Sequence, residues 1–427
     1  MLDWDRLLNG NRMTPVSDRG IPEIRSPLEI DRDRILFSSV FRRLEDKTQV
    51  FPLQAGGLLR NRLTHSHEVS VLARSVVTAL NRADVAGLDH ERTRHFQGLI
   101  EAISLAHDLG NPPFGHKGEQ AISAWFAGNG RSLVPAGHVE DFLNFDGNAQ
   151  TFRILTRVPS VSPTTRGMNL CASTLAALVK YPAPMARKRS YFVADAGIYA
   201  WAAEECGLEP GQRHPATSIM EACDDIAYLV ADVEDCLTTG IFDLRDVLDG
   251  LGSVERGESL SRLSDRVLAK LAEFVDAGLD EASASRLVGP YFRSMAIANL
   301  VSPMDRAFSS AASDGDFNRS LLDRAGPAGG LWRSLKEFGK RQIYGHASVS
   351  ASECKGIEAI GIALDVLSQG LEGVSPEASA NLPMEVTLDF LAGPVGGWHL
   401  VDAISLMTDH QIVDFARDHR PSLRRAM

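Results

Sequence analysis

The stretch LAHDLGNPPFGHKGEQ, residues 105–120, places two histidines and two carboxylates around a pair of prolines. His107 and Asp108 stand at the end of an apolar run, and Gly110 and the prolines then interrupt the chain. Neighbouring residues on a helix point about 100° apart, so two adjacent ligands cannot share one metal ion from the middle of a helix without local distortion. At a helix end the backbone can turn, and we therefore expect His107 and Asp108 to converge there.

Apolar residues recur at helical spacing on both sides of this stretch. Segments 66–80, 96–109 and 217–235 carry them at three- and four-residue steps, which is typical of amphipathic helices. Further candidate helices are STLAALVKY (173–181), SRLSDRVLAKLAEFVDAGL (261–279) and KGIEAIGIALDVLSQGL (355–371). Convincing alternating strands are scarce, and the glycine-containing LDGLGSVER (248–256) reads as loop. The predicted fold class is all-α.

The chain offers no clear linker and no internal repeat. Segments rich in Gly, Pro and Ser are candidate loops, namely 9–27, 127–138, 157–168, 207–216, 312–330 and 370–383. We expect a helical core with an N-terminal arm in residues 1–245 and a helical C-terminal part in residues 246–427 packed on it. One continuous domain is the alternative.

Composition excludes several classes of protein. The 427 residues are 44% hydrophobic and 23% charged, with a formal net charge of −11, which argues against a general nucleic-acid coat. No run approaches the roughly 20 apolar residues of a membrane-spanning helix, and the N-terminus lacks the basic and apolar regions of a secretory signal. Five scattered cysteines without a C-x-x-C pair predict reduced, buried thiols in a cytoplasmic protein: Cys171, Cys206, Cys223, Cys236 and Cys354.

Three separate candidate helices offer side chains that bind metals. His65 stands at the start of one, His107 and Asp108 end the second, and Asp224 and Asp225 lie within the third. Imidazoles and carboxylates without thiolates suit a divalent ion rather than a structural zinc site. Each feature is weak alone, because a His-Asp pair is common by chance. Their order on successive helices gives the set its weight.

The chain also contains blocks that carry a family resemblance: DRDRILFSSVFRRLEDKTQVFPL (31–53), RNRLTHSHEV (60–69), LAHDLGNPPFGHKGEQAI (105–122), NFDGNAQTFRILTR (144–157), MNLCASTLAALVKYP (168–182), MEACDDIAYLVADVED (220–235), RQIYGHASV (341–349) and LVDAISLMTD (400–409). With these blocks the chain resembles the HD-domain deoxynucleoside triphosphate triphosphohydrolases of the bacterial dGTPase type. The blocks appear in family order over nearly the whole chain. The resemblance implies an HD-domain helical core with a helical C-terminal extension.

The resemblance implies one divalent metal ion, bound by His65, His107, Asp108 and Asp224. Asp224 is preferred to Asp225 because the family's ligand is the first acid of its DDIAY block. Manganese or magnesium is the expected ion, with iron, cobalt, nickel and zinc as alternatives.

The resemblance makes His116 the catalytic histidine near the α-phosphate. Glu119 would orient or polarise it, and the i, i+3 spacing on a helix permits that contact. Many members have histidine at the position of Asn111, where an amide can donate a hydrogen bond to a phosphate but cannot act as acid or base. Because Asn111 cannot exchange a proton, we expect His116 to carry out the proton transfer.

Four further positions match the family's substrate contacts. Tyr228 and Asp232 follow Asp224 by four and eight residues, so they share one helix face. The resemblance implies that Tyr228 packs against the deoxyribose and crowds a 2′-hydroxyl, while Asp232 and Gln49 bind the 3′-hydroxyl. Arg62 would lie near the triphosphate.

The implied activity is metal-dependent hydrolysis of dNTPs, dGTP foremost, at the α-phosphorus to deoxynucleoside and inorganic triphosphate. Block position suggests Lys180, Arg341 and Lys355 as further phosphate contacts. Alternatives are an HD nucleotidase or phosphodiesterase acting on other nucleotides, and a nucleotide- or nucleic-acid-sensing regulator with a vestigial HD site. The family also leads us to expect a homo-oligomer with an allosteric nucleotide or single-stranded DNA effector, and no membrane partner.

Overall fold

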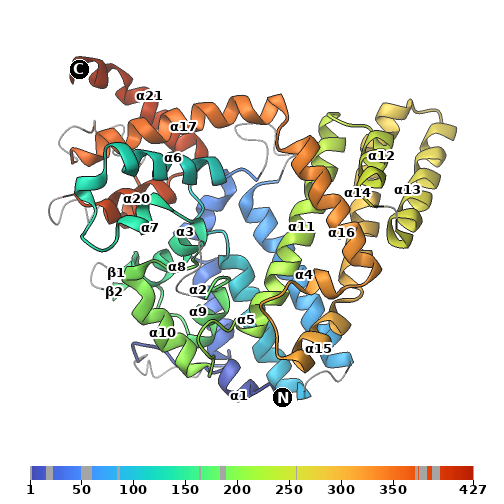
Figure 1. Ribbon diagram of the computed structural model, residues 1–427, viewed down its shortest axis with the longest axis horizontal. Coiled ribbons are helices and arrows are strands. Elements are labelled where there is room, and N and C mark those ends of the chain that lie inside the picture. The colour runs from blue at the N-terminus through green and yellow to red at the C-terminus, as the bar shows by residue number, and fades with distance from the viewer. Residues whose placement is uncertain are drawn as a thin grey trace.

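The fold is known from a computed structural model (Figure 1), which describes residues 2–15, 23–49, 60–83, 87–162, 165–182, 189–255, 257–370, 374, 382–386 and 395–426. Within these residues the secondary structure is helical apart from one short antiparallel pair of strands, β1 (Pro159–Ser162) and β2 (Thr165–Arg166), and the isolated β-bridges Arg12–Cys171 and Thr48–Asn61. The predicted all-α class is confirmed.

The elements follow one another as short and long helices. The first half contains α1 (Trp4–Leu7), α2 (Pro27–Leu36), α3 (Ser39–Arg42), η1 (Arg43–Asp46), α4 (Arg62–Arg82), α5 (His90–Ala106), α6 (Gly115–Gly128), η3 (Arg131–Leu133), α7 (Val139–Leu143), α8 (Gly147–Arg157), α9 (Ala172–Leu178), η4 (Val193–Asp195) and α10 (Ala196–Glu205). The second half contains α11 (Pro215–Thr239), α12 (Leu244–Val254), α13 (Glu258–Asp276), α14 (Glu281–Val301), α15 (Met304–Asp314), η5 (Leu321–Arg324), α16 (Pro327–Phe338), the π-helical turn η6 (Gly339–Ile343), α17 (Ala347–Ser368), α20 (Gly397–Leu406) and α21 (Asp409–Ala426).

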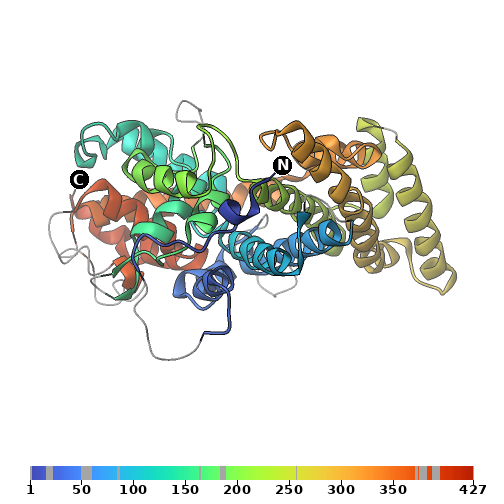
Figure 2. The same ribbon diagram turned by 90° about the horizontal axis from the view of Figure 1, so that it is seen from below.

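Helix α11 lies at the centre of the molecule (Figures 1 and 2). It packs against α4 and α5 on one side and against α14 and α16 on another. Most of its residues are buried as a result, including the apolar Ile226 and Val230 and the acidic Asp232. A helix that is covered on several sides can hold buried polar groups only where neighbouring helices supply partners.

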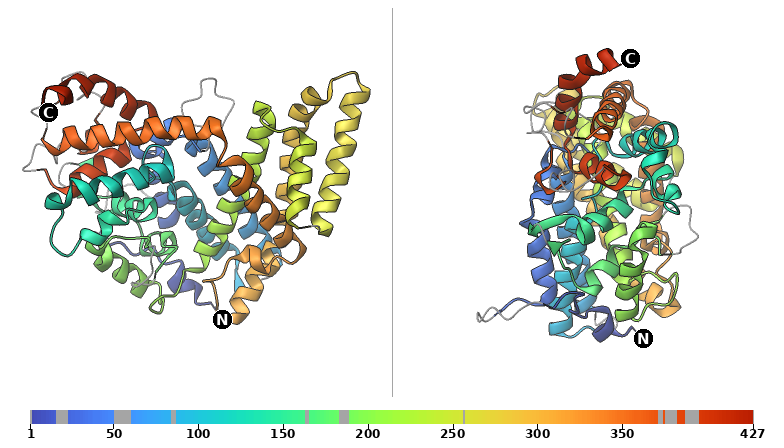
Figure 3. Two further views of the ribbon diagram at one scale, coloured as in Figure 1. Left: turned by 45° about the horizontal axis from the view of Figure 1, so that its top comes forward. Right: turned by 90° about the vertical axis from the view of Figure 1, so that its left-hand side faces the viewer.

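Residues after 246 lie at two ends of the molecule (Figure 3). Helices α12 to α16 pack on or near α11, whereas α17 packs against α6 and α21, and α20 contacts α8 and α17. The residues after 246 therefore contact the preceding part of the chain at both ends. The boundary between residues 245 and 246 stays a prediction.

The loop predicted for residues 248–256 is wrong, because most of it belongs to α12. The two glycines of that segment suggested a break. Asp243 caps the helix in a reciprocal capping box with Asp246, and the apolar face containing Val247 and Leu251 is buried. Burial of an amphipathic face outweighs the roughly 1 kcal/mol that each glycine costs a helix.

The predicted helices 66–80, 217–235 and 261–279 lie within or largely within α4, α11 and α13. Four cysteines are buried as expected, but Cys354 is exposed, which corrects the prediction for that thiol. Among the described helices, none combines the length and the apolar character needed to cross a membrane.

The N-terminus of α11 is capped by a neutral histidine. Nδ1 of His214 accepts the backbone N–H of Ala216 at 3.1 Å, and Nε2 donates to the carbonyl of Leu7 at 2.9 Å. Burial lowers the pKa of His214 to about 4. A proton added to Nδ1 would face the N–H of Ala216, so the folded state resists protonation.

We expect His214 to make the free energy of unfolding fall as the pH falls from about 6.5 to about 4. The unfolded chain, with an ordinary histidine pKa near 6.5, binds the proton more readily in that window, so this contribution is complete above it and lost below it. The His214→Asn variant keeps an acceptor at the cap but cannot titrate. Urea unfolding at a series of pH values gives the free energy of unfolding of both proteins. Between about pH 6.5 and pH 4 the variant should lose less of this free energy than the wild type does, by up to about 3 kcal/mol. Equal pH dependence in the two proteins would refute this account.

Candidate metal centre

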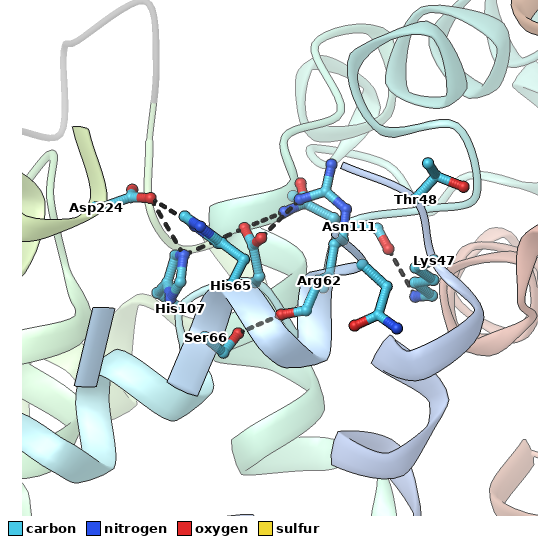
Figure 4. Close-up of polar contacts among 12 residues, drawn as sticks. Lys47, Thr48, Arg62, His65, Ser66, His107, Asn111 and Asp224 are labelled. Carbon is cyan, nitrogen blue, oxygen red and sulfur yellow. Dashed lines mark hydrogen bonds and ion pairs between the residues drawn. The ribbon is translucent and has the colours of Figure 1, made fainter. Parts of the chain in front are cut away.

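Three of the predicted ligands converge in the structure. Nitrogen or oxygen atoms of His65, His107 and Asp224 all lie within 4.8 Å of one another. His65 Nε2 is 3.0 Å from Asp224 Oδ1, and His107 Nε2 is 3.4 Å from the same oxygen (Figure 4). The three side chains come from α4, the end of α5 and α11, so the cluster joins three helices.

Helix ends bring two of these ligands into place. Asn61 caps α4, which puts His65 in its first turn, while His67 is exposed and contacts the ring of Phe41 instead. Helix α5 ends at Ala106 and His107 forms its C-cap. The chain turns there, and the neighbouring acid brings its Oδ1 to 3.6 Å from Nε2 of His107.

The donor atoms suit a divalent cation. His107 Nδ1 donates to the carbonyl of Ser104 at 2.7 Å, which leaves the lone pair on Nε2. This Nε2 is buried and lacks a hydrogen bond of good geometry within the described residues. Burial alone would lower the pKa of His107, but the carboxylates of Asp108 and Asp224 raise it. An imidazole lone pair between carboxylates fits a metal ion well.

Asp108 lies at the edge of this cluster with a partner on each oxygen. Oδ2 accepts from Arg62 Nη1 at 2.7 Å, and Oδ1 accepts from the side-chain amide of Asn111 (Figure 4). Burial disfavours the charged carboxylate, but the guanidinium of Arg62 holds the pKa of Asp108 below its ordinary value. Asp108 is therefore an anion, already oriented toward His107.

Asp224 has a cationic neighbour on its second oxygen. Lys180 Nζ lies 2.9 Å from Asp224 Oδ2. Burial opposes ionisation of Asp224, yet Lys180 and His107 keep its pKa well below the ordinary value. Of the other cations suggested for phosphate, Arg341 pairs with Glu337 at the surface and Lys355 is exposed.

His116 and Glu119 form a separate pair on α6. His116 Nδ1 is 2.7 Å from Glu119 Oε2, and the imidazole is 82% exposed. Glu119 Oε1 accepts the N–H of Gly147 at 2.7 Å, which fixes the carboxylate to the start of α8. A Cβ at Gly147 would lie 2.4 Å from Asn111 Oδ1 and 3.1 Å from Glu119 Oε1. Gly147 therefore lies between Glu119 and Asn111, the hydrogen-bond partner of Asp108.

Two of the residues predicted to contact the sugar, Tyr228 and Asp232, lie on α11 beyond Asp224. The ring of Tyr228 is 6.4 Å from that of His65. Asp232 is buried, which raises its pKa, and its Oδ2 accepts from the Tyr344 hydroxyl at 2.8 Å. Gln49 Oε1 is buried without a hydrogen bond to any described residue.

Sequence reasoning missed Tyr344, Lys47 and Asp409. Tyr344 also stacks on the ring of Tyr228 at 5.8 Å. Asp409 accepts from both donors of Thr48, at 2.9 and 2.7 Å. All three missed residues stand inside the quoted blocks, which was the available signal, but the blocks do not reveal which distant groups they meet.

The chain is similar to known bacterial proteins over most of its length. A deoxyguanosinetriphosphate triphosphohydrolase-like protein of Listeria monocytogenes is 34% identical to the chain over 391 residues, covering 84% of this chain and 82% of the relative. The deoxyguanosinetriphosphate triphosphohydrolase of Serratia proteamaculans is 30% identical over 401 residues, covering 81% and 77%. A probable deoxyguanosinetriphosphate triphosphohydrolase of Pseudomonas aeruginosa is 31% identical over 388 residues, covering 81% and 76%. No family model matches the chain.

We expect Gly110→Ala to destabilise the protein by at least about 2 kcal/mol, because a side chain there collides with backbone. The added Cβ would lie 2.1 Å from Thr151 N and 2.4 Å from the carbonyl oxygen of Gly147. Gly361→Ala, in α17, is the matched control, because a Cβ at that position meets nothing within 4 Å. The control should be neutral or stabilising by up to about 1 kcal/mol in urea unfolding. Equal effects of the two changes would disprove the close approach of this turn to α8.

Proposed function

The chain belongs to the bacterial deoxyguanosinetriphosphate triphosphohydrolase family, and we propose that it hydrolyses deoxynucleoside triphosphates, dGTP foremost, to deoxynucleoside and inorganic triphosphate. The observation that carries the proposal is the convergence of the family's ligand positions. His65, His107 and Asp224 meet on one point between three helices, with Asp108 beside them.

The proposed cofactor is one divalent metal ion, manganese or magnesium, with iron, cobalt, nickel and zinc as alternatives. His65, His107, Asp108 and Asp224 would hold it. When bound, such an ion would polarise an α-phosphate oxygen and acidify the attacking water. Water attack at the α-phosphorus breaks the bond to the 5′-oxygen and releases triphosphate intact.

The proton and the charge are handled by neighbouring side chains in this proposal. The contact between His116 Nδ1 and Glu119 directs the Nδ1 proton to the carboxylate, so Nε2 exchanges a proton with the reacting groups. Arg62 carries its positive charge beside the cluster, since the pKa of its guanidinium is raised by Asp108 despite burial. It would neutralise charge on the phosphates.

Tyr228, Asp232 and Gln49 are proposed to bind the deoxyribose. Tyr228 is adjacent to a ligand histidine on the same side of α11 as Asp224, which would place the sugar next to the α-phosphate. Asp232 has one oxygen on Tyr344, so the other oxygen is the acceptor proposed for the 3′-hydroxyl. Assembly as a homo-oligomer, a nucleotide or single-stranded DNA effector and a cytoplasmic location stay predictions.

We expect triphosphate as the phosphorus product. The purified protein with Mn²⁺ or Mg²⁺ and each dNTP should give a ³¹P NMR spectrum of inorganic triphosphate, and the reaction should stop in EDTA. The Asp224→Ala variant should lose activity by at least about 1,000-fold, because it removes a proposed metal ligand whose Oδ1 also contacts both histidines. Orthophosphate as the first product would point instead to a nucleotidase, and no turnover of any dNTP, even with the other dNTPs present as activators, would refute the proposal.

We expect the enzyme to prefer dGTP to GTP by at least about tenfold in kcat/KM, because the ring of Tyr228 would crowd a 2′-hydroxyl. The Tyr228→Ala variant should narrow this ratio even where its overall activity falls. Parallel assays of the two nucleotides with both proteins give the ratio directly. An unchanged ratio in the variant would remove Tyr228 from sugar selection.

A further inference from the structure

We propose that Lys47 is a positioning residue of the metal centre, which acts through Asn111 on the ligand Asp108. This inference rests on the proposed metal-dependent function. Neither the family resemblance nor the metal-ligand geometry assigns Lys47 a task. It stands in the DRDRILFSSVFRRLEDKTQVFPL block just after η1.

Lys47 is almost fully buried, with 2% of its surface exposed. Its Nζ donates to the backbone carbonyl of Asn111 at 2.7 Å and to the carbonyl of Ser405 near the end of α20. Burial, with a smaller contribution from the charge of Arg62, lowers the pKa of Lys47 to about 7. A buried ammonium is expensive, so its two carbonyl bonds mark it as a connection that the fold retains despite the cost.

The connection continues from Asn111 to the metal centre. Asn111 lies in the turn between Gly110 and Pro112, where the proline offers no N–H for a hydrogen bond. While Lys47 holds the carbonyl of Asn111, the side-chain amide of the same residue donates to Asp108 Oδ1. That oxygen is the one that faces His107 Nε2. Holding Asn111 therefore holds the oxygen that would bind the ion.

The location of Lys47 argues against a direct contact with the ion. In Figure 4 it lies on the far side of Asn111 from Asp224, and its ammonium is directed to carbonyl oxygens. Its second bond, to Ser405, ties the same turn to the C-terminal part of the chain. An outer partner of a metal ligand typically changes metal affinity by 10- to 100-fold, which sets the scale for a test.

The test is a double-mutant cycle on Mn²⁺ affinity, measured by isothermal titration calorimetry without nucleotide. Lys47→Met removes the ammonium, and Asn111→Ala removes the amide while leaving the carbonyl. Each should weaken Mn²⁺ binding by about tenfold or more. The double variant should bind no more weakly than Asn111→Ala, within about twofold, because both changes break one connection. Lys270→Met, a change of a surface lysine on α13, is the matched control and should bind as the wild type does.

Two outcomes would overturn the inference about Lys47 and leave the proposed function untouched. One is wild-type Mn²⁺ affinity in Lys47→Met, and the other is additive losses in the double variant, which would mean that Lys47 acts independently of Asn111. If Lys47→Met does not fold, as judged by circular dichroism, Lys47→Gln replaces it in the cycle and the same outcomes apply. Loss of Mn²⁺ binding in the Asp224→Ala variant would show that the measured ion binds at the proposed centre. If the wild type binds no Mn²⁺, the cycle is run with Mg²⁺, Fe²⁺, Co²⁺, Ni²⁺ and Zn²⁺ in turn, and a wild type that binds none of these ions would overturn both this inference and the proposed function.

Discussion

One oxygen of a half-buried carboxylate, Oδ1 of Asp224, is the point on which the structure depends. His65 and His107 both direct Nε2 to it, so a single atom on α11 joins the start of α4 to the end of α5. Such an arrangement is tolerable only because cations balance the buried carboxylates of the centre. Lys180 lies on the second oxygen of Asp224, and Arg62 holds the neighbouring acid. The helices are therefore arranged around a group of charges that would be unstable if any partner were removed.

The turn that follows α5 connects this centre to other parts of the molecule. Gly110 lets the backbone approach α8 closely, and the side chain of Asn111 donates to the proposed ligand Asp108 while Lys47 holds the carbonyl of Asn111. Further along, Asp409 accepts the N–H of Phe114 and so ties the start of α21 to the start of α6. The C-terminal residues thus help to shape a centre whose proposed ligands all lie before residue 225.

Much of the fold and part of the candidate site can be predicted from the sequence. Helical periodicity is a local pattern, and it identifies α4, α5 and α11. The order of His65, His107 and Asp224 along these helices can also be seen in the sequence, and it indicates a shared ion. Residues 248–256 were misjudged because burial of the α12 face, a tertiary effect, outweighs two glycines. Partners such as Lys47 with Ser405 or Tyr344 with Asp232 lie far apart in the chain. No local pattern records which distant carbonyl or carboxylate a buried donor meets, so those contacts require the structure.

The central claim is that one divalent ion binds between His65, His107, Asp108 and Asp224. X-ray diffraction from crystals soaked in Mn²⁺, with data collected to reveal anomalous scattering, tests it most directly. The account predicts one strong anomalous peak about 2 Å from Nε2 of both histidines and from an oxygen of both aspartates. A peak at Asp225, a peak elsewhere in the chain, or no peak at a saturating Mn²⁺ concentration would contradict it.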